Sequence, residues 1–324
     1  MGVNASVLAI DAGNSKTDVA LIGADGTVLS TARGGGFQPP VVGVEAAVDM
    51  LGAAVGRALE LSGAPDGPVT HVSACLANAD LPVEEEQLAA ALRARGWGST
   101  VAVRNDTFAI LRAGVDEPRG VAVVCGAGIN CVGMVPDGRT ARFPAIGRIS
   151  GDWGGGSGLA EEAMWFASRS EDGRGEPTEL ARTLPAHFGL GSMYALIEEL
   201  HLGRIESERR YELTPVLFAT AAAGDAVAGA LVDRLAGEVV TMASVALRRL
   251  GLLDEEAPVV LGGGVLAARH PRLDDRIAEL LTIRAPKAVV RVVTEPPVLG
   301  AALLGLDHTG AAAGVHARLR AQYG

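Results

Sequence analysis

Hydrophobic and polar positions follow two different periods along the first sixty residues. Residues 7–10 form an unbroken apolar run that ends at Asp11, which is typical of a buried strand, and residues 18–22 and 27–32 continue as two more strands. Residues 44–61 instead predict an amphipathic helix, because apolar side chains recur there at spacings of three and four. Its expected core positions are Val44, Val48, Leu51, Val55 and Leu59.

The elements that follow complete one lobe, and the pattern then starts again. They are a strand over 69–76, a helix over 84–95, a strand over 100–104 and a short helix opened by Asn105-Asp106-Thr107. From residue 121 the chain again reads strand, glycine turn, strand, Asp-Gly turn, strand, and its Asp-Gly turn at 137–138 matches the one at 25–26. The repeat indicates a duplicated lobe, and chance likeness between two hairpins is the alternative.

The second lobe is predicted to be mainly helical after residue 144. We expect helices over 158–169, 179–187, 192–201, 215–223 and 226–250, and strands over 258–261 and 288–293. The predicted domains are therefore a first lobe over 1–116 and a second over 117–297. A small-residue helix opens the C-terminal segment 298–324, which we expect to pack back on the first lobe.

Composition narrows the class of protein. The 324-residue chain is 48% hydrophobic, which supports a sizeable core, while its 4% aromatic content and net charge of −10 disfavour a nucleic-acid partner. No apolar run reaches the roughly 18 residues that a membrane helix needs. The six histidines are scattered and predict no structural zinc. Without a C-x-x-C pair, the three cysteines fit reduced thiols in a cytoplasmic protein: Cys75, Cys125 and Cys131.

Asp11 and the turn after it predict a phosphate site. Gly13 lets the backbone approach an anion closely, and successive N–H groups in such a turn form an anion-binding concavity. Further donors come from Asn14, Ser15, Lys16 and Thr17. An acid at the end of the first strand is typical of enzymes that hold a γ-phosphate and its metal, whereas an ordinary hairpin turn is the alternative. The string is not the G-x-x-x-x-G-K-[ST] of P-loop proteins.

Two other glycine strings predict ligand contacts in the second lobe. The first repeats the phosphate turn at the duplicated position and comprises Gly126, Ala127, Gly128 and Asn130. The second stands between a predicted strand and a helix, where bare backbone suits adenine and ribose, and comprises Gly262, Gly263 and Gly264. A tight strand–helix turn without a ligand would show the same glycines.

Asp106 and Asp152 are candidate acids for a substrate that carries hydroxyl groups. Asp106 follows a strand end, where it could accept a hydroxyl proton during phosphoryl transfer; alternatively, Asn105 or Asp106 caps the next helix. Asp152 lies in a glycine-rich loop over 149–158, where it could accept hydrogen bonds from a sugar, with Trp153 as an apolar wall. A helix-capping loop with a core tryptophan is the alternative there.

These motifs resemble those of the actin/hexokinase/Hsp70-like phosphotransferases. The string D-A-G-N-S-K-T-D most resembles the family that unites N-acetylglucosamine kinases with BadF/BadG/BcrA/BcrD ATPases, and the resemblance spans nearly the whole chain. It implies a two-lobed α/β fold with duplicated ribonuclease H-like lobes and ATP in the cleft between them. It further implies Asp106 as the general base and Asp11 as the partner of Mg²⁺.

The resemblance also implies N-acetylglucosamine as the acceptor, phosphorylated to its 6-phosphate. Asn105, Asp106 and Asp152 would then contact the sugar, and Gln38 stands in the place of a family asparagine. Two departures leave glucosamine, another hexose or a polyol open as acceptors. Two prolines follow Gln38, and Trp153 stands where many members have glutamate.

Two other functions stay open at this point. Electron-activating ATPases resemble this nucleotide fold but hold an iron–sulfur cluster across a dimer with paired cysteines, whereas no cysteine follows Cys131 here. A nucleotide- or sugar-binding protein without catalysis is disfavoured by the presence of both Asp11 and Asp106. The sequence does not decide the donor nucleotide, the pathway, or between a monomer and a homodimer.

Overall fold

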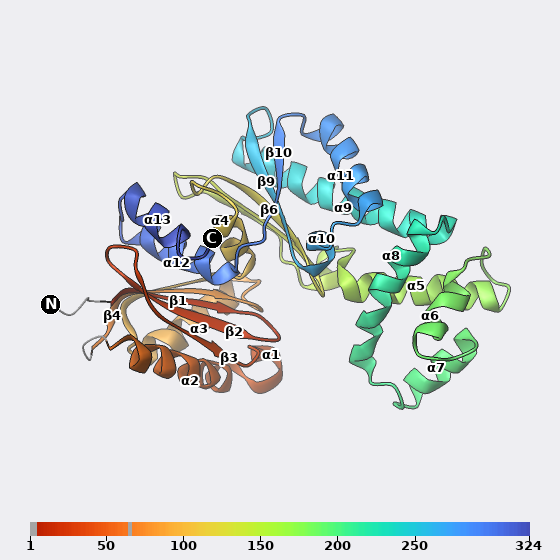
Figure 1. The fold of residues 1–324 in the computed structure, drawn as a ribbon, viewed down its shortest axis with the longest axis horizontal. Helices are drawn as coiled ribbons and strands as arrows, with labels where there is room; N and C mark the ends of the chain where they lie inside the picture. The colour runs from red at the N-terminus through yellow and green to blue at the C-terminus, as the bar shows by residue number, and fades with distance from the viewer. Residues whose placement is uncertain (1–4, 64–66) are drawn as a thin grey trace. The chain divides into compact units, whose positions relative to one another are not determined.

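The computed structural model describes residues 5–63 and 67–324, which form two compact units (Figure 1). The segments of unit 1 are 1–122, 132–144 and 293–324, and those of unit 2 are 123–131 and 145–292. These units follow contacts between residues rather than the duplicated elements, so the lobes predicted over 1–116 and 117–297 stay a prediction.

Unit 1 is built on a five-stranded sheet of order β3-β2-β1-β4-β5. β1 is antiparallel to β2 and parallel to β4, and β4 is parallel to β5. The elements are β1 (Ala5–Ala12), β2 (Thr17–Gly23), β3 (Val28–Gly34), α1 (Pro39–Val42), α2 (Val44–Ser62), β4 (Val69–Leu76), α3 (Pro82–Ala94), β5 (Gly98–Asn105), α4 (Thr107–Ala113), β8 (Thr140–Arg142), α12 (Pro297–His308) and α13 (Ala313–Arg320).

The second sheet has the order β10-β9-β6-β7-β8, and the boundary between the units passes through β6 (Gly120–Cys125) and β7 (Ile129–Met134). Helices make up most of unit 2. Its other elements are η1 (Gly147–Ser150), α5 (Gly155–Glu171), α6 (Leu180–His187), α7 (Met193–His201), η2 (Ser207–Glu212), α8 (Leu213–Ala222), α9 (Ala226–Leu250), β9 (Ala257–Gly262), α10 (Gly264–Ala267), α11 (Pro271–Arg284) and β10 (Ala288–Val292).

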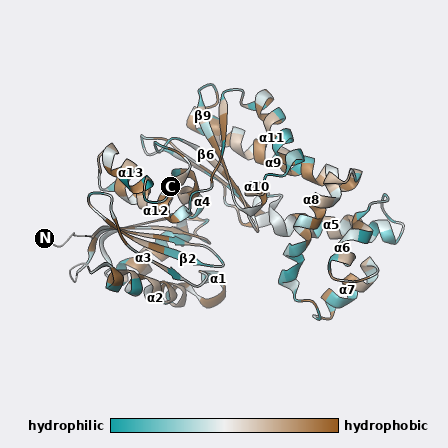
Figure 2. Ribbon diagram, viewed as in Figure 1, coloured by the Kyte–Doolittle hydropathy of each residue, from teal (hydrophilic) through white to brown (hydrophobic). Residues whose placement is uncertain are grey.

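The amphipathic pattern of α2 determines how this helix packs. Val48, Leu51 and Val55 are buried against apolar residues of β1 and β2, while Val44 and Leu59 at the ends of the stripe are partly buried. Figure 2 shows hydrophobic residues both along the strands of unit 1 and in its helices. Burial of these side chains, worth about 1.5–3 kcal/mol each, holds α2 on the sheet that carries the candidate site.

The C-terminal helix α12 packs on β1 and α4 of unit 1. Two of its glycines allow this close approach. A Cβ on Gly300 would lie 1.8 Å from the Ala109 carbonyl oxygen, and one on Gly305 would lie 2.3 Å from Cγ1 of Val7. The small residues that made this segment recognisable in the sequence are therefore required by its packing.

Some elements differ in extent from those expected, and others were missed. The strand expected after the Asp-Gly turn at 137–138 is only Thr140–Arg142, and the helix expected from 158 begins at Gly155. Helix α11 (Pro271–Arg284) was not predicted, although Leu273, Ile277 and Leu281 recur every four residues and are its buried positions against α9. Most residues of this helix are polar or charged, so the hydropathy of the segment does not reveal its buried positions.

In the described part of the chain, no single helix combines the length and hydropathy of a membrane span. Ser207–Ala222 and Ala226–Leu250 meet the criterion only as a pair, and the two segments are bent by 110° relative to each other.

His71 and His308 form a ring stack between β4 and the end of α12. His71 is 1% exposed, and its ring centroid lies 3.9 Å from that of His308. Its Nδ1 is 2.8 Å from the Thr100 hydroxyl, but its buried Nε2 has no hydrogen-bond partner. Burial and, to a smaller extent, the neighbouring His308 lower the pKa of His71 to about 4.

We expect His71 to contribute to acid destabilisation. Because its pKa is lower in the folded state than the ordinary 6.5, the unfolded chain binds more protons in this window, so stability is lost as the pH falls from 6.5 toward 4. The free energy of unfolding, measured in urea, falls between about pH 7 and 4.5. His71→Phe should make this fall smaller by about 1–2 kcal/mol. His201→Phe, at an exposed position, is the control. Equal acid sensitivity of both variants would contradict this role.

Candidate active site

The turn between β1 and β2 is anchored at its base and exposed at its tip. The Gly13 N–H donates to the Lys16 carbonyl oxygen at 2.9 Å, which closes the turn. Thr17 is buried, and its hydroxyl donates to the Gly35 carbonyl oxygen at 2.9 Å. Residues 14–16 are exposed. The predicted phosphate turn is therefore a fixed loop with an open tip, which suits an anion.

The loop after β3 supports this turn. The Phe37 N–H donates to the Gly13 carbonyl oxygen at 2.9 Å, and a Cβ on Gly36 would lie 2.1 Å from the Asn14 carbonyl oxygen. The Gln38 side chain donates to that same Asn14 oxygen at 3.0 Å. Gln38, expected at the sugar, is thus exposed and bound to the phosphate turn, so its two following prolines stiffen a loop that holds the turn in place.

Asn78 is a further support that the sequence analysis missed. Its side-chain amide donates to Asn14 Oδ1 at 2.9 Å and to the Phe37 carbonyl oxygen at 3.2 Å, joining the turn to its supporting loop. Its φ of 61° lies in the left-handed region, which asparagine tolerates better than most residues. The sequence did offer one signal for this role, because Asn78 stands two residues beyond the strand predicted over 69–76.

The register of the parallel strands brings Asp11 and Asp106 to one edge of the sheet. Asp11 of β1 is level with Cys75 of β4, and the Asp106 N–H donates to the carbonyl oxygen of the next β4 residue, Leu76, at 3.2 Å. Burial and, to a smaller extent, the charge of Asp106 raise the pKa of Asp11 to about 7. The pKa of Asp106 is raised to about 6, because its burial outweighs the opposing effect of hydrogen bonds with Thr107. Such shifts are typical of functional sites.

Asn105 caps helix α4 with its side chain, whereas the sequence left this role open between Asn105 and Asp106. Asp106 stands at the N-cap of α4, but its side chain makes no capping hydrogen bond. Instead, Asn105 Oδ1 accepts from the Thr107 N–H at 2.9 Å, and Asn105 Nδ2 donates to Asp80 Oδ1 at 2.8 Å. Asn105 is buried, and its side chain rather than that of Asp106 makes this capping hydrogen bond. Asp80, which lies beyond β4, was not predicted.

In unit 2, the start of α5 packs on the second glycine turn. The Gly156 N–H donates to the Gly126 carbonyl oxygen at 2.7 Å, and the Ser157 N–H donates to that of Ala127 at 3.0 Å. Gly155 has a φ of +75°, and a Cβ there would lie 2.4 Å from the Ala127 carbonyl oxygen. The glycines before α5 are thus required by contact with the turn. Asn130, also predicted at phosphate, accepts the Cys131 N–H at 2.7 Å.

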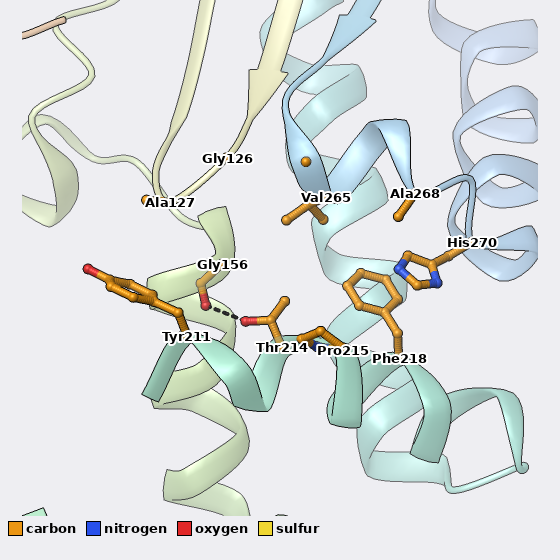
Figure 3. Close-up of a pocket in the computed structure, with 11 residues that line it drawn as sticks. Gly126, Ala127, Gly156, Tyr211, Thr214, Pro215, Phe218, Val265, Ala268 and His270 are labelled. Atoms are coloured by element: carbon orange, nitrogen blue, oxygen red, sulfur yellow. Dashed lines mark hydrogen bonds between the residues drawn. The ribbon is translucent and has the colours of Figure 1, made fainter. Parts of the chain in front are cut away.

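A cavity of about 380 Å³ lies between this turn and the glycine triplet (Figure 3). Gly263 has a φ of +82°, and a Cβ there would lie 2.5 Å from the Cys125 carbonyl oxygen. Two features of the cavity wall were not predicted: Thr214 donates to the Gly156 carbonyl oxygen at 2.7 Å, and Phe218 stacks on His270 with ring centroids 3.9 Å apart. A mainly apolar cavity with few polar groups suits a nucleoside.

Asp152 and Trp153 line a second cavity of about 300 Å³ in unit 2. Asp152 Oδ2 accepts from the Gly147 N–H at 3.1 Å and from the Ser150 hydroxyl. Trp153 is 8% exposed, its Nε1 donates to Glu162 at 3.2 Å, and the Arg234 guanidinium lies 4.0 Å from its ring. Most of the indole is therefore engaged within the protein, and Asp152 lines this cavity together with Arg148 and Glu161.

The structure gathers the predicted residues into two sets, one in each unit. Unit 1 carries Asp11, Gly13, Asn14, Ser15, Lys16, Thr17, Gln38, Asn105 and Asp106. Unit 2 carries Gly126, Ala127, Gly128, Asn130, Asp152, Trp153, Gly262, Gly263 and Gly264.

The acids of unit 1 fit a divalent cation. Within residues 5–63 and 67–324, no three His, Cys, Asp or Glu side chains form a ligand cluster. Mg²⁺ needs fewer, since proteins commonly hold it by one or two carboxylates together with phosphate oxygens and waters. A cation beside Asp11 and Asp106 would relieve both their desolvation and their mutual repulsion.

Comparison with known proteins gives matches along most of the chain. The family model described as the BadF/BadG/BcrA/BcrD ATPase family matches residues 8–305. An N-acetylmuramic acid/N-acetylglucosamine kinase from Clostridium acetobutylicum is 25% identical over 228 residues, covering 70% of this chain and 74% of that protein. An N-acetyl-D-glucosamine kinase from Dictyostelium discoideum is 26% identical over 245 residues, which cover 74% of this chain and 76% of that protein.

A solved structure shows the same fold. It is that of a candidate N-acetylglucosamine kinase from Chromobacterium violaceum, with a TM-score of 0.69 and 23% identity over 93% of this chain and 99% of that one. This likeness confirms the predicted two-lobed α/β fold class.

Removing the charge of Asp11 should stabilise the free protein at neutral pH. Its pKa is raised in the folded state, so the ionised form destabilises folding; the cost is absent below about pH 3.8 and complete above about 7. Asp11→Asn should therefore raise the free energy of unfolding by about 1–3 kcal/mol at pH 8 and change it little at pH 4.

Urea unfolding at the two pH values measures this difference. Glu86→Gln, at an exposed position of α3, is the matched control and should have no pH-dependent effect. A loss of stability in Asp11→Asn at pH 8 would show that the carboxylate is stabilised by its surroundings.

Proposed function

The chain belongs to the BadF/BadG/BcrA/BcrD ATPase family, and on that premise we propose that it is an ATP-dependent sugar kinase that converts N-acetylglucosamine to its 6-phosphate. The observation that carries the proposal is the pair of desolvated carboxylates, Asp11 and Asp106, at the strand edge from which the phosphate turn starts. The kinase names of the two curated relatives support the substrate class.

Asp106 is the proposed general base. A pKa of about 6 leaves its carboxylate ionised at neutral pH and still basic enough to accept the proton of a sugar hydroxyl in the transition state. Phosphoryl transfer otherwise depends on positioning and charge stabilisation. Asp11 would hold Mg²⁺, which supplies neutralisation of the phosphate charge when bound. The turn over 13–17 would donate its N–H groups and side chains to phosphate oxygens.

Unit 2 supplies the proposed nucleoside and sugar contacts. The cavity beside Gly263 and the Phe218–His270 stack suits an adenine base and its ribose. The turn over 126–130 would contact phosphates, as would its counterpart in unit 1. Asp152 would accept hydrogen bonds from sugar hydroxyls, with its orientation fixed by the Gly147 N–H.

The cysteines argue against the alternative function, that of an electron-activating ATPase. Cys75, Cys125 and Cys131 are all buried free thiols. Burial raises the pKa of each, to about 12 for Cys125, whereas an iron–sulfur cluster needs accessible thiolates. The kinase proposal therefore accounts better for these side chains.

Replacing Asp106 should abolish sugar-dependent turnover. In a coupled ADP-release assay with MgATP, N-acetylglucosamine should stimulate ADP release, and Asp106→Asn should lower kcat by about 10²–10⁴-fold with little change in the KM for ATP. Since the base must be ionised, kcat/KM of the native protein should fall below about pH 6.

A panel of sugars identifies the acceptor. Glucosamine, glucose, N-acetylmannosamine and a reaction without sugar are run beside N-acetylglucosamine, and Asp49→Asn on the exposed surface of α2 is the control variant. No stimulation by any sugar, or full activity in Asp106→Asn, would refute the proposal.

Filling the nucleoside cavity should weaken ATP binding. Ala268 is exposed and lines this cavity, so Ala268→Trp should raise the KM for ATP by at least about tenfold without disturbing the core. Ala267 is also exposed but does not line the cavity, so Ala267→Trp is the matched control. Equal KM values in the two variants would place the nucleoside elsewhere.

A further inference from the structure

The loop over residues 77–81 joins β4 to α3 and contacts both parts of the candidate site in unit 1. Asn78 of this loop donates to Asn14 of the phosphate turn at 2.9 Å. Asp80 of the same loop accepts a hydrogen bond at 2.8 Å from Nδ2 of Asn105, the residue before the proposed general base. The position of this loop therefore determines how the base and the phosphate turn lie relative to each other.

The backbone of Asp80 is held through both its N–H and its carbonyl oxygen. The N–H donates to Glu84 Oε2 at 3.0 Å, a contact within the same stretch of chain. The carbonyl oxygens of Ala79 and Asp80 accept hydrogen bonds from Arg142 Nη2 at 3.3 and 3.2 Å. Ala79 is fully buried, and a buried carbonyl oxygen needs a donor. A residue distant in the sequence thus donates to the 77–81 loop.

Arg142 lies on β8, opposite Val132 of β7 in the second sheet. Its Nη1 donates to Glu85 Oε2 of α3 at 2.7 Å, and its guanidinium lies 5.9 Å from the ring centre of Phe108 on α4. The side chain is 26% exposed. Residues 132–144 are grouped with unit 1, although their sheet continues in unit 2, and the contacts of Arg142 with α3 and α4 agree with this grouping.

The planar guanidinium explains how one side chain makes both kinds of contact. Its donors are fixed in a fork, so pairing Nη1 with Glu85 determines where Nη2 points. Nη2 then meets two consecutive carbonyl oxygens of the loop, those of Ala79 and Asp80. An ion pair with Glu85 alone would need no such direction. The arrangement therefore favours a role for Arg142 in fixing the loop.

We propose that Arg142 is a positioning residue for phosphoryl transfer, which acts by fixing the 77–81 loop. Through the side chains of Asp80 and Asn105, the fixed loop holds Asp106 in place at the strand edge. This inference rests on the proposed function, since it takes Asp106 as the general base. A hydroxyl proton is transferred efficiently only over a short, aligned distance, so a loosened loop lowers kcat although Arg142 acts only through other residues.

The kinetic test compares Arg142→Gln in two backgrounds of the full chain, with N-acetylglucosamine and MgATP. In the native background it should lower kcat about tenfold or more, while the KM for ATP changes by less than about threefold. In an Asp106→Asn background it should change kcat by less than about twofold, because the base that it positions has been removed. An equal loss of kcat in both backgrounds, or no loss in either, overturns the inference.

Arg139→Gln is the matched control. Arg139 belongs to the same hairpin, is 61% exposed and pairs with Asp137 of its own turn, so kcat should not change. A loss of kcat in Arg139→Gln as large as that in Arg142→Gln would show a general effect of altering the hairpin and would overturn the inference.

Asp80→Ala tests the second step of the same route. It removes the acceptor of the Asn105 side chain and leaves the ion pair of Arg142 with Glu85 in place. It should lower kcat about as much as Arg142→Gln, and the double variant should be no slower than the slower single variant, because both act through one route. This variant also serves if Arg142→Gln does not fold, and full kcat in Asp80→Ala overturns the inference.

Amide hydrogen exchange separates this inference from the proposed function. The backbone N–H groups of Asp106 and Thr107 are both hydrogen-bonded at the start of α4. Their exchange should be about tenfold faster in Arg142→Gln than in Arg139→Gln, because the loop that holds this segment is loosened.

The two measurements can fail independently. If N-acetylglucosamine is phosphorylated but Arg142→Gln matches Arg139→Gln in kcat and in exchange, the inference is wrong and the kinase proposal stands. If no sugar is phosphorylated, the kinase proposal is wrong, and exchange alone decides whether Arg142 holds Asp106 in place. Faster exchange in Arg142→Gln supports that link, and equal exchange overturns it.

Discussion

The desolvation of Asp11 next to Asp106 is the constraint on which the candidate chemistry depends. Three parallel strands end at one sheet edge, and this register places two carboxylates where water is scarce. The arrangement destabilises the free protein at neutral pH, because two ionised groups are held together away from solvent. Unfavourable electrostatics of this kind persist where a bound cation or a transferred proton can relieve them.

Backbone contacts hold both phosphate turns by the same physical means. In unit 1 the loop at Gly36 lies against the turn at Asn14, and in unit 2 Gly155 lies against the turn at Ala127. Each contact is too close for a Cβ. A turn fixed by neighbouring backbone presents its N–H groups to an anion without first losing conformational entropy, so it is preorganised for phosphate.

Two of the side chains expected at the sugar are engaged in contacts within their own units. Gln38 supports the phosphate turn, and Trp153 is held by Glu162 and Arg234. The two departures from the expected family pattern are therefore accommodated by new contacts.

The sequence by itself determined most of the strands and longer helices, the glycine turns and the family, because these depend on local periodicity and on residues that only close backbone approach requires. It also placed Asp11 and Asp106 at strand ends. It left the choice of helix cap open between Asn105 and Asp106, and it gave no sign of the Phe218–His270 stack. Only the tertiary structure decided these, because strand register, ring stacking and desolvation arise between residues far apart in the chain.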